Sequence, residues 1–227
     1  MQEFEPDQLK ITTKFIQNSI LNKGWVSPQN LQAQVELRNL FGTPAINHRI
    51  TGTIYLTPQA LPFNAYPDII FNDPLRDLSK PSKTFSETLS DIQTNNNGLA
   101  TFNLDLGRYL QSTYQLTLLS RGFVSNGGRG VSQTSSILVS PLKYLVGYKT
   151  ENNLEYLRKN TKSTVHFIAI NSELKKIQLK NLKIKLIQLN NILTLTEQNN
   201  GNYQYQSVLQ EHTITNMDFL YPLQKVR

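Results

Sequence analysis

Cysteine is absent from all 227 residues of the chain. Disulfide bonds, thiolate metal sites and cysteine nucleophiles are therefore excluded within this sequence, although the absence does not fix the compartment. Long hydrophobic runs are also missing, because no apolar stretch approaches the roughly 20 residues that a membrane-spanning helix needs. The opening MQEFEPDQLK lacks the basic and apolar pattern of a signal peptide, and strand-like residues directly after Met1 predict a segment of a longer protein.

Acidic residues are scarce towards the C-terminal end, which produces most of the net charge of +7. Residues 1–140 carry 11 Lys and Arg against 10 Asp and Glu, whereas residues 141–227 carry 12 against 6. A basic surface can bind nucleic acid. However, Lys183 and Lys185 alternate with apolar residues, as on the solvated face of a strand, and no arginine–aromatic interleaving accompanies them. We therefore expect no nucleic-acid partner and interpret these lysines as solvated charge.

Long amphipathic helical patterns are missing as well, and strict alternation of apolar and polar residues takes their place. The run LQAQVEL, for example, is typical of a half-buried β-strand. The turn sequences NNNG (95–98), NGGRG (126–130) and NNGN (199–202) separate such runs. Many short strands between these turns predict an all-β fold of antiparallel β-sandwiches. The expected core of the first sandwich consists of Leu31, Val35, Leu37, Phe102, Leu104, Tyr114, Leu116 and Leu118.

The length accommodates two sandwiches of about 100 residues each, a typical domain size. Pro141 follows a strand-like run, cannot donate to a β-ladder, and coincides with the change in charge balance. We therefore predict residues 1–8 as the tail of, or linker from, a preceding domain. Residues 9–140 are expected to form one sandwich, and 141–227 a second sandwich that could be truncated at its C-terminus.

The candidate catalytic and metal-binding residues do not form recognisable patterns. His48, His166 and His212 are far apart and lack metal-ligand spacing. The glycine-rich NGGRG precedes strand-like rather than helical sequence, which favours a hairpin turn over a phosphate-binding loop. We expect no catalytic, cofactor-binding or metal-binding residues, no cofactor, no small-molecule substrate and no enzymatic activity.

Three aspartates, Asp68, Asp73 and Asp77, cluster in YPDIIFNDPLRD. Carboxylates gathered in a loop can bind Ca²⁺ through their oxygens. Their spacing matches no calcium loop, however, and Asp before proline is ordinary turn chemistry. The interpretation that we prefer is a structural turn.

The stretch NLFGTPAINHRITGTIYL breaks an alternating run with a corner and then resumes it. We expect Gly42 to have a positive φ, or to lie where a Cβ would clash, and Pro44 to fix an extended or turn geometry. We expect Phe41 to be buried, where it would plug the end of the sandwich. In the alternative, the corner contacts a partner domain of a longer protein and Phe41 is exposed.

Several stretches of the chain resemble the bacterial α2-macroglobulin family. QEFEPDQLKI resembles the connection into a macroglobulin-like domain, and GWVSPQNLQAQVELRNLFGTPAINHRITGTI resembles the first hairpin of such a domain, including its Phe-Gly-Thr-Pro-Ala corner. TNNNGLATFNLDL is similar to a strand beginning of the same superfamily, and VSPLKYLVGYKTENNLEYLRKNTKSTVHFIAINSE to the opening of the next domain. The resemblance covers nearly the whole chain.

The resemblance implies tandem β-sandwiches of macroglobulin or Ig-like (fibronectin-like) type. It also implies a structural scaffold segment of a protease-trapping endopeptidase inhibitor in the periplasm or cell envelope of a Gram-negative bacterium. The parent would be membrane-anchored and the segment itself soluble. Its expected partners are neighbouring domains of the parent chain and the target proteases of the parent. Because many members carry a cysteine-containing thioester and this chain has no cysteine, no thioester residue is carried over.

Two other functions stay open from the residues alone. A tandem Ig-like adhesin or carbohydrate-binding module would present an exposed aromatic platform, which Tyr203 and Tyr205 could supply, although same-face tyrosines often pack across strands. An enzyme accessory domain is neither supported nor excluded.

Overall fold

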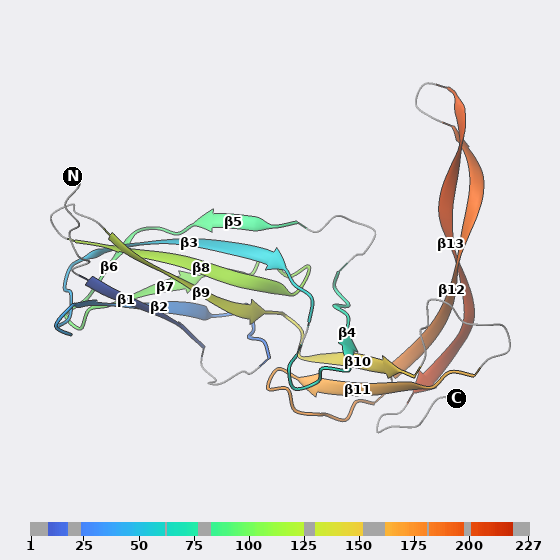
Figure 1. Ribbon diagram of the computed structural model, residues 1–227, viewed down its shortest axis with the longest axis horizontal. Coiled ribbons are helices and arrows are strands. Elements are labelled where there is room, and N and C mark those ends of the chain that lie inside the picture. The colour runs from blue at the N-terminus through green and yellow to red at the C-terminus, as the bar shows by residue number, and fades with distance from the viewer. Residues whose placement is uncertain are drawn as a thin grey trace, which may run out of the picture. The chain divides into compact units, whose positions relative to one another are not determined.

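A computed structural model describes residues 9–17, 24–61, 63–76, 83–124, 130–151, 162–180, 182–197 and 201–219. All regular elements in these ranges are β-strands, β1 to β13, and the pairings with a defined register are antiparallel (Figure 1). The all-β, antiparallel architecture expected from the sequence is therefore confirmed. Within the same ranges, no helix is long and apolar enough to cross a membrane.

The chain divides into two compact units, which are described separately. The first contains Met1–Lys149 and Phe167–Lys176, and the second contains Thr150–His166 and Ile177–Arg227. The candidate functional site of this protein lies in the first unit.

The first unit contains a sandwich of two antiparallel sheets (Figure 1). One sheet has the strand order β1-β2-β7, and the other has the order β5-β3-β8-β9 with β6 also paired to β3. The strands of the first sheet are Leu9–Ile16 (β1), Leu31–Asn39 (β2) and Leu99–Leu104 (β7). Those of the second are Arg49–Pro58 (β3), Phe85–Thr88 (β5), Ile92–Gln93 (β6), Tyr114–Phe123 (β8) and Gly130–Val139 (β9).

The apolar core lies between these two sheets because alternate residues of each strand point inward. Along β2, Ala33, Val35 and Leu37 have no exposed surface, while Gln32 on the opposite face is exposed. All eight core residues expected from the sequence are buried in this cluster, which confirms that prediction.

Two hydroxyl groups connect the sheets inside this apolar layer. Thr13 on β1 and Ser120 on β8 are buried, and their side-chain oxygens lie 2.7 Å apart. Ser120 Oγ also donates to the backbone carbonyl of Gln133 on β9, at 3.2 Å. Since a buried hydroxyl is costly without a partner, this pair fixes how β1 faces the second sheet.

A second, smaller core accompanies a three-stranded sheet of order β11-β10-β4. Its strands are Ile70–Phe71 (β4), Tyr144–Thr150 (β10) and Val165–Asn171 (β11). Its core residues are Trp25, Leu61, Phe63, Phe71, Leu145, Ile168 and Ile170. Trp25 Nε1 donates to the carbonyl of Leu142 at 2.7 Å, which ties the segment between β1 and β2 to the segment between β9 and β10.

The domain boundaries drawn from the sequence, 1–8, 9–140 and 141–227, stay predictions. Pro141 lies between β9 and β10, which belong to different sheets. The smaller core nevertheless takes side chains from both sides of residue 140. Residues 1–8 lie outside the described part of the chain.

The second unit contains a long antiparallel hairpin of β12 (Leu182–Glu197) and β13 (Tyr203–Phe219). A register shift interrupts it between Leu186 and Ile187. Gly201, in the predicted turn, has a φ of +79°, a conformation that glycine adopts without steric cost. A complete second sandwich over 141–227 stays a prediction.

Truncating Phe102 tests the sandwich core. Phe102 is 3% exposed and its ring lies close to the backbone at Gly52, so Phe102→Ala would leave a cavity. We expect a loss of about 3–5 kcal/mol in the free energy of unfolding, measured by urea denaturation of the chain. Thr101→Ala, on the exposed face of the same strand, should change it by less than about 0.5 kcal/mol. A loss below about 1 kcal/mol for Phe102→Ala would contradict the assigned core.

Candidate functional site

The three histidines lie on separate elements. His48 Nδ1 is 2.8 Å from the carbonyl oxygen of Phe123, a contact that ties the start of β3 to the end of β8. His166 Nε2 lies 3.6 Å from a carboxylate oxygen of Glu151, and His212 is exposed on β13 opposite Gln188. Among the described residues, no group of three or more His, Cys, Asp or Glu side chains is placed to hold a metal ion.

The aspartates of the predicted turn point to separate partners. Asp73 accepts hydrogen bonds from Ser112 Oγ at 2.9 Å, from the amide of Thr113 and, at 3.0 Å, from the amide of Leu75. Asp68 forms an exposed ion pair with Lys149 at 2.9 Å, whereas Asp77 lies outside the described residues. Asp73 therefore anchors its loop to the segment that leads into β8, which agrees with a structural turn.

That anchor also affects a neighbouring tyrosine. Burial and, to a lesser extent, the negative charge of Asp73 raise the pKa of Tyr114 above its usual value of 10.0. Tyr114 is 4% exposed in the sandwich core, so its neutral form is favoured for a structural reason.

The remaining sequence candidates are also placed on strands or turns. Lys183 and Lys185 are exposed and alternate with the half-buried Ile184, as expected for a solvated strand face. Tyr203 and Tyr205 are exposed on β13. Residues 126–129 of NGGRG lie outside the described ranges, and the following Gly130 begins β9, a strand as expected.

The corner between β2 and β3 is the feature that departs most from an ordinary turn. The amide of Gly42 donates to the carbonyl of Asn39 at 2.8 Å, which closes a four-residue turn. Gly42 has a φ of +83°, so the expected positive φ is confirmed. Arg38 donates to the carbonyl of Gly42 at 2.8 Å, and the Asn39 side chain donates to Thr43 Oγ1 at 2.9 Å. The turn is therefore held by its own side chains.

The apex of this turn carries two large apolar side chains in solvent. Phe41 is 97% exposed and Leu40 is 59% exposed. The expectation that Phe41 is buried at the end of the sandwich is therefore wrong. Leu40 and Phe41 are exposed because the Asn39–Gly42 hydrogen bond closes the turn, and the two central residues of such a turn project away from the strands. We call Leu40 and Phe41 the apolar tip.

Smaller residues close the end of the sandwich in place of Phe41. Ala45 is 1% exposed, and its carbonyl accepts a hydrogen bond from Thr94 Oγ1 at 2.6 Å. The same Thr94 hydroxyl accepts from the amide of His48 at 2.9 Å. Ala45 and Thr94 are therefore buried at the end of the sandwich, whereas Phe41 is not.

Leu40 was not named as a candidate functional residue from the sequence, although the residues of the turn contain a signal for it. Turn apices usually carry Gly, Pro, Asn, Asp or Ser, whereas this one carries adjacent leucine and phenylalanine. An apolar pair at such a position can bind another apolar surface, and it has no group for acid–base or nucleophilic chemistry. Among the described residues, the tip is thus a candidate contact site.

Comparison with known proteins identifies the family. The model of the bacterial alpha-2-macroglobulin MG5 domain matches residues 17–141. The chain belongs to the bacterial alpha-2-macroglobulin family. The resemblance noted in the sequence is therefore confirmed, and the apolar tip lies inside the matched region.

Relatives of this macroglobulin segment are much longer proteins. The chain is 40% identical over 215 residues to an alpha-2-macroglobulin of Pasteurella multocida, covering 94% of this chain and 11% of that protein. It is 39% identical over 215 residues to an alpha-2-macroglobulin homolog of Yersinia pestis, covering 95% of this chain and 10% of that protein. The chain thus spans about a tenth of the length of these relatives.

Solved structures confirm the macroglobulin-type fold. The native conformation of E. coli alpha-2-macroglobulin matches with a TM-score of 0.63 at 14% identity, over 99% of this chain and 14% of that one. E. coli alpha-2-macroglobulin activated by porcine elastase matches with a TM-score of 0.61 at 17% identity, over 98% of this chain and 20% of that one. At such low identity the likeness concerns the fold alone.

Two substitutions separate the structural and contact roles of the corner. Gly42→Val should destabilise the chain by about 1–3 kcal/mol through backbone strain, because φ is positive there; an added Cβ would meet no neighbouring atom, so no clash contributes. Phe41→Ser should leave the urea midpoint nearly unchanged, since the ring is exposed. Gly42→Asn is the control and should cost less than Gly42→Val, because asparagine tolerates this conformation. A clear loss of stability with Phe41→Ser would show that the ring is buried after all.

Proposed function

We propose that this chain is a structural scaffold segment of a bacterial alpha-2-macroglobulin that traps proteases, and that it has no enzymatic activity of its own. The observation that carries the proposal is the family match over residues 17–141, together with relatives that align over nearly the whole chain. The described residues support it, since their acidic and histidine side chains are engaged in separate structural contacts or exposed on different elements.

The proposed role requires a module that keeps its shape while a larger molecule rearranges. The sandwich provides this, because one apolar core joins both sheets and the Thr13–Ser120 pair links them at a buried point. A related E. coli protein is described as activated by porcine elastase. In our proposal, the present segment positions its neighbours while proteolysis elsewhere in the protein triggers capture.

The proposed partners are the neighbouring domains of the parent chain and, through the parent, its target proteases. We propose no nucleic-acid partner and no small-molecule substrate for this segment. We also propose the periplasm or cell envelope of a Gram-negative bacterium as its location, with a membrane-anchored parent. These proposals rest on the family and on the multidomain length of its relatives.

A second candidate, the adhesin or carbohydrate-binding module, has one observation in its favour. Tyr203 and Tyr205 are 63% and 70% exposed, and residues two apart lie on the same face of a strand. Aromatic side chains of this kind can stack on sugars. Family membership favours the scaffold, and binding of the chain to a glycan array, lost in Tyr203→Ala with Tyr205→Ala, would favour the adhesin.

Protease inhibition assays test the scaffold role. The 227-residue chain, incubated with trypsin or elastase, should leave cleavage of both small and large substrates unchanged and should hydrolyse neither. A full-length macroglobulin that contains the chain should block cleavage of large substrates while small ones are still cleaved. Stoichiometric inhibition by the isolated chain, or free cleavage of large substrates with the full-length protein, would contradict the proposal.

A further inference from the structure

We propose that the apolar tip, Leu40 and Phe41, is the docking site for the domain that immediately precedes this segment in the full-length macroglobulin. The inference rests on the proposed scaffold function and specifies one partner of the segment. It begins from the exposure of two adjacent large apolar residues at a hydrogen-bonded turn. Exposed apolar side chains that are held together mark interaction sites when a partner is close enough to cover them.

The tip is preorganised for contact. The Asn39–Gly42 backbone hydrogen bond, the Arg38 contact to the Gly42 carbonyl and the positive φ of Gly42 together fix the turn. A binding surface that is already ordered loses little conformational entropy when a partner covers it. An aromatic ring at the apex is the type of residue that commonly supplies much of the free energy of an interface.

Strand register places the tip next to the start of β1. Leu9, the first residue of β1, lies opposite Asn39, the last residue of β2. Paired residues in antiparallel strands have Cα atoms about 4.5–5.5 Å apart. Leu9, where β1 begins, therefore lies beside the residue that starts the turn.

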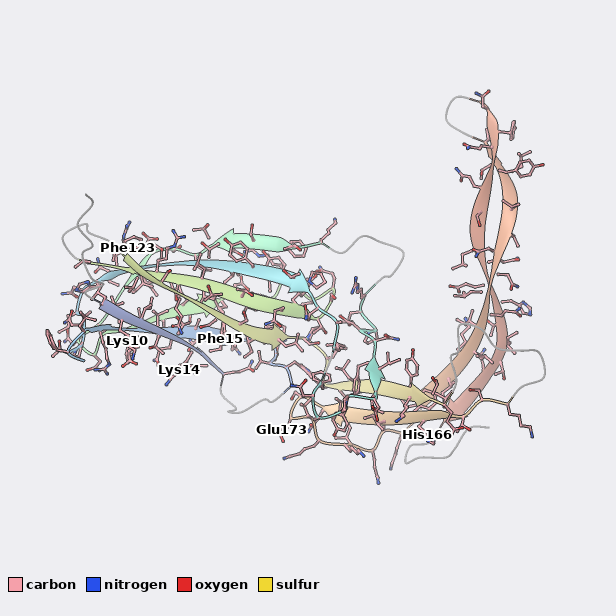
Figure 2. The ribbon with its side chains drawn as sticks, viewed as in Figure 1. Lys10, Lys14, Phe15, Phe123, His166 and Glu173 are labelled. Atoms are coloured by element: carbon pink, nitrogen blue, oxygen red, sulfur yellow. The ribbon has the colours of Figure 1, made fainter. Side chains whose placement is uncertain are left out.

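The continuation of the chain leaves from the opposite end of the sandwich. Val139, the last residue of β9, pairs with Tyr114, the first residue of β8. The other end of β8, Phe123, contacts His48 beside the corner. The ten residues of β8 span about 33 Å, which separates the two ends. Figure 2 shows Lys10 and Phe123 at the same end, with Phe15 farther along the sandwich.

The preceding part of the parent chain is accordingly the favoured occupant. Relatives are about nine times as long as the matched region, so a full-length member has other domains to place. A covalently tethered neighbour has an effective concentration in the millimolar range. Even a small apolar contact is then occupied, whereas a free second molecule would need a larger interface.

The surroundings of the tip indicate the chemistry of the partner surface. Lys10 lies opposite Arg38 at the base of the turn, and Arg49 stacks over Phe123, 4.4 Å from its ring centroid. Arg38 pairs with Glu36 at 2.6 Å, so part of this charge is balanced locally. We infer a partner surface with an apolar pocket for Phe41, bordered by hydrogen-bond acceptors or carboxylates.

Photo-crosslinking in the full-length protein tests the docking site. Phe41→p-benzoylphenylalanine places a reactive ketone at the tip, and irradiation followed by mass spectrometry identifies the joined peptide. We expect crosslinks to the domain that precedes residue 1. The control is Leu110→p-benzoylphenylalanine, because Leu110 is 40% exposed and lies shortly before the start of β8, at the opposite end. This control should give no crosslink to the preceding domain.

Other results would overturn the proposal. These are a crosslink from position 41 to residues after 227, a crosslink to a second molecule, a crosslink confined to this chain, or recovery of the peptide without any crosslink. A second measurement uses Phe41→Ser in the full-length protein. Hydrogen exchange in the preceding domain should become several-fold faster on the surface that contacts the tip, and unchanged exchange there would also overturn the proposal.

The docking site and the scaffold function can fail independently. Protease trapping by the full-length protein reports on the function, whereas the crosslinked peptide reports on the docking partner. A crosslink to the preceding domain in a protein that traps no protease would retain the docking site and reject the function. Protease trapping without that crosslink would retain the function and reject the docking site.

Discussion

The pairing register between β1 and β2 is the constraint on which the rest of this structure depends. It places Leu9 and Thr13 of β1 in the buried layer and turns Lys10 and Lys14 towards solvent (Figure 2). A slip of one residue would reverse every side chain of β1 and bury both lysines. Burying unpaired ammonium groups is costly enough to exclude that register. The Thr13–Ser120 contact then links β1 to the opposite sheet.

This register has a consequence beyond the core. Because Leu9 is paired with Asn39, the start of the sandwich and the turn after β2 share one end. The turn exposes Phe41 and Leu40 there, while Ala45 and Thr94 close the core beneath them. A scaffold segment needs fixed contacts with its neighbours, and the fold supplies an ordered apolar contact beside its own first strand.

Much of the fold could be predicted from sequence because alternation reports directly on which residues face a core. The eight core positions and the positive φ of Gly42 follow from local patterns. The direction of Phe41 does not, since it follows from the Asn39–Gly42 hydrogen bond, and the residues buried at that end of the sandwich include Thr94, which is distant in sequence. The pairing of β4 with β10 and the anchoring by Asp73 likewise join distant segments, so periodicity carries no signal for them.

The register of β1 can be measured directly, since the chain has no cysteine of its own. Thr12 lies opposite Glu36, whereas Gln34 lies opposite Lys14, two positions away on the same face. Antiparallel partners fall within the Cα separation that a disulfide needs, and the offset pair lies beyond it. Under mild oxidation, the variant with Thr12→Cys and Glu36→Cys should form an intramolecular disulfide, and the one with Thr12→Cys and Gln34→Cys should stay reduced. Disulfide formation in the offset variant, or in neither, would contradict the register and the position of the tip that follows from it.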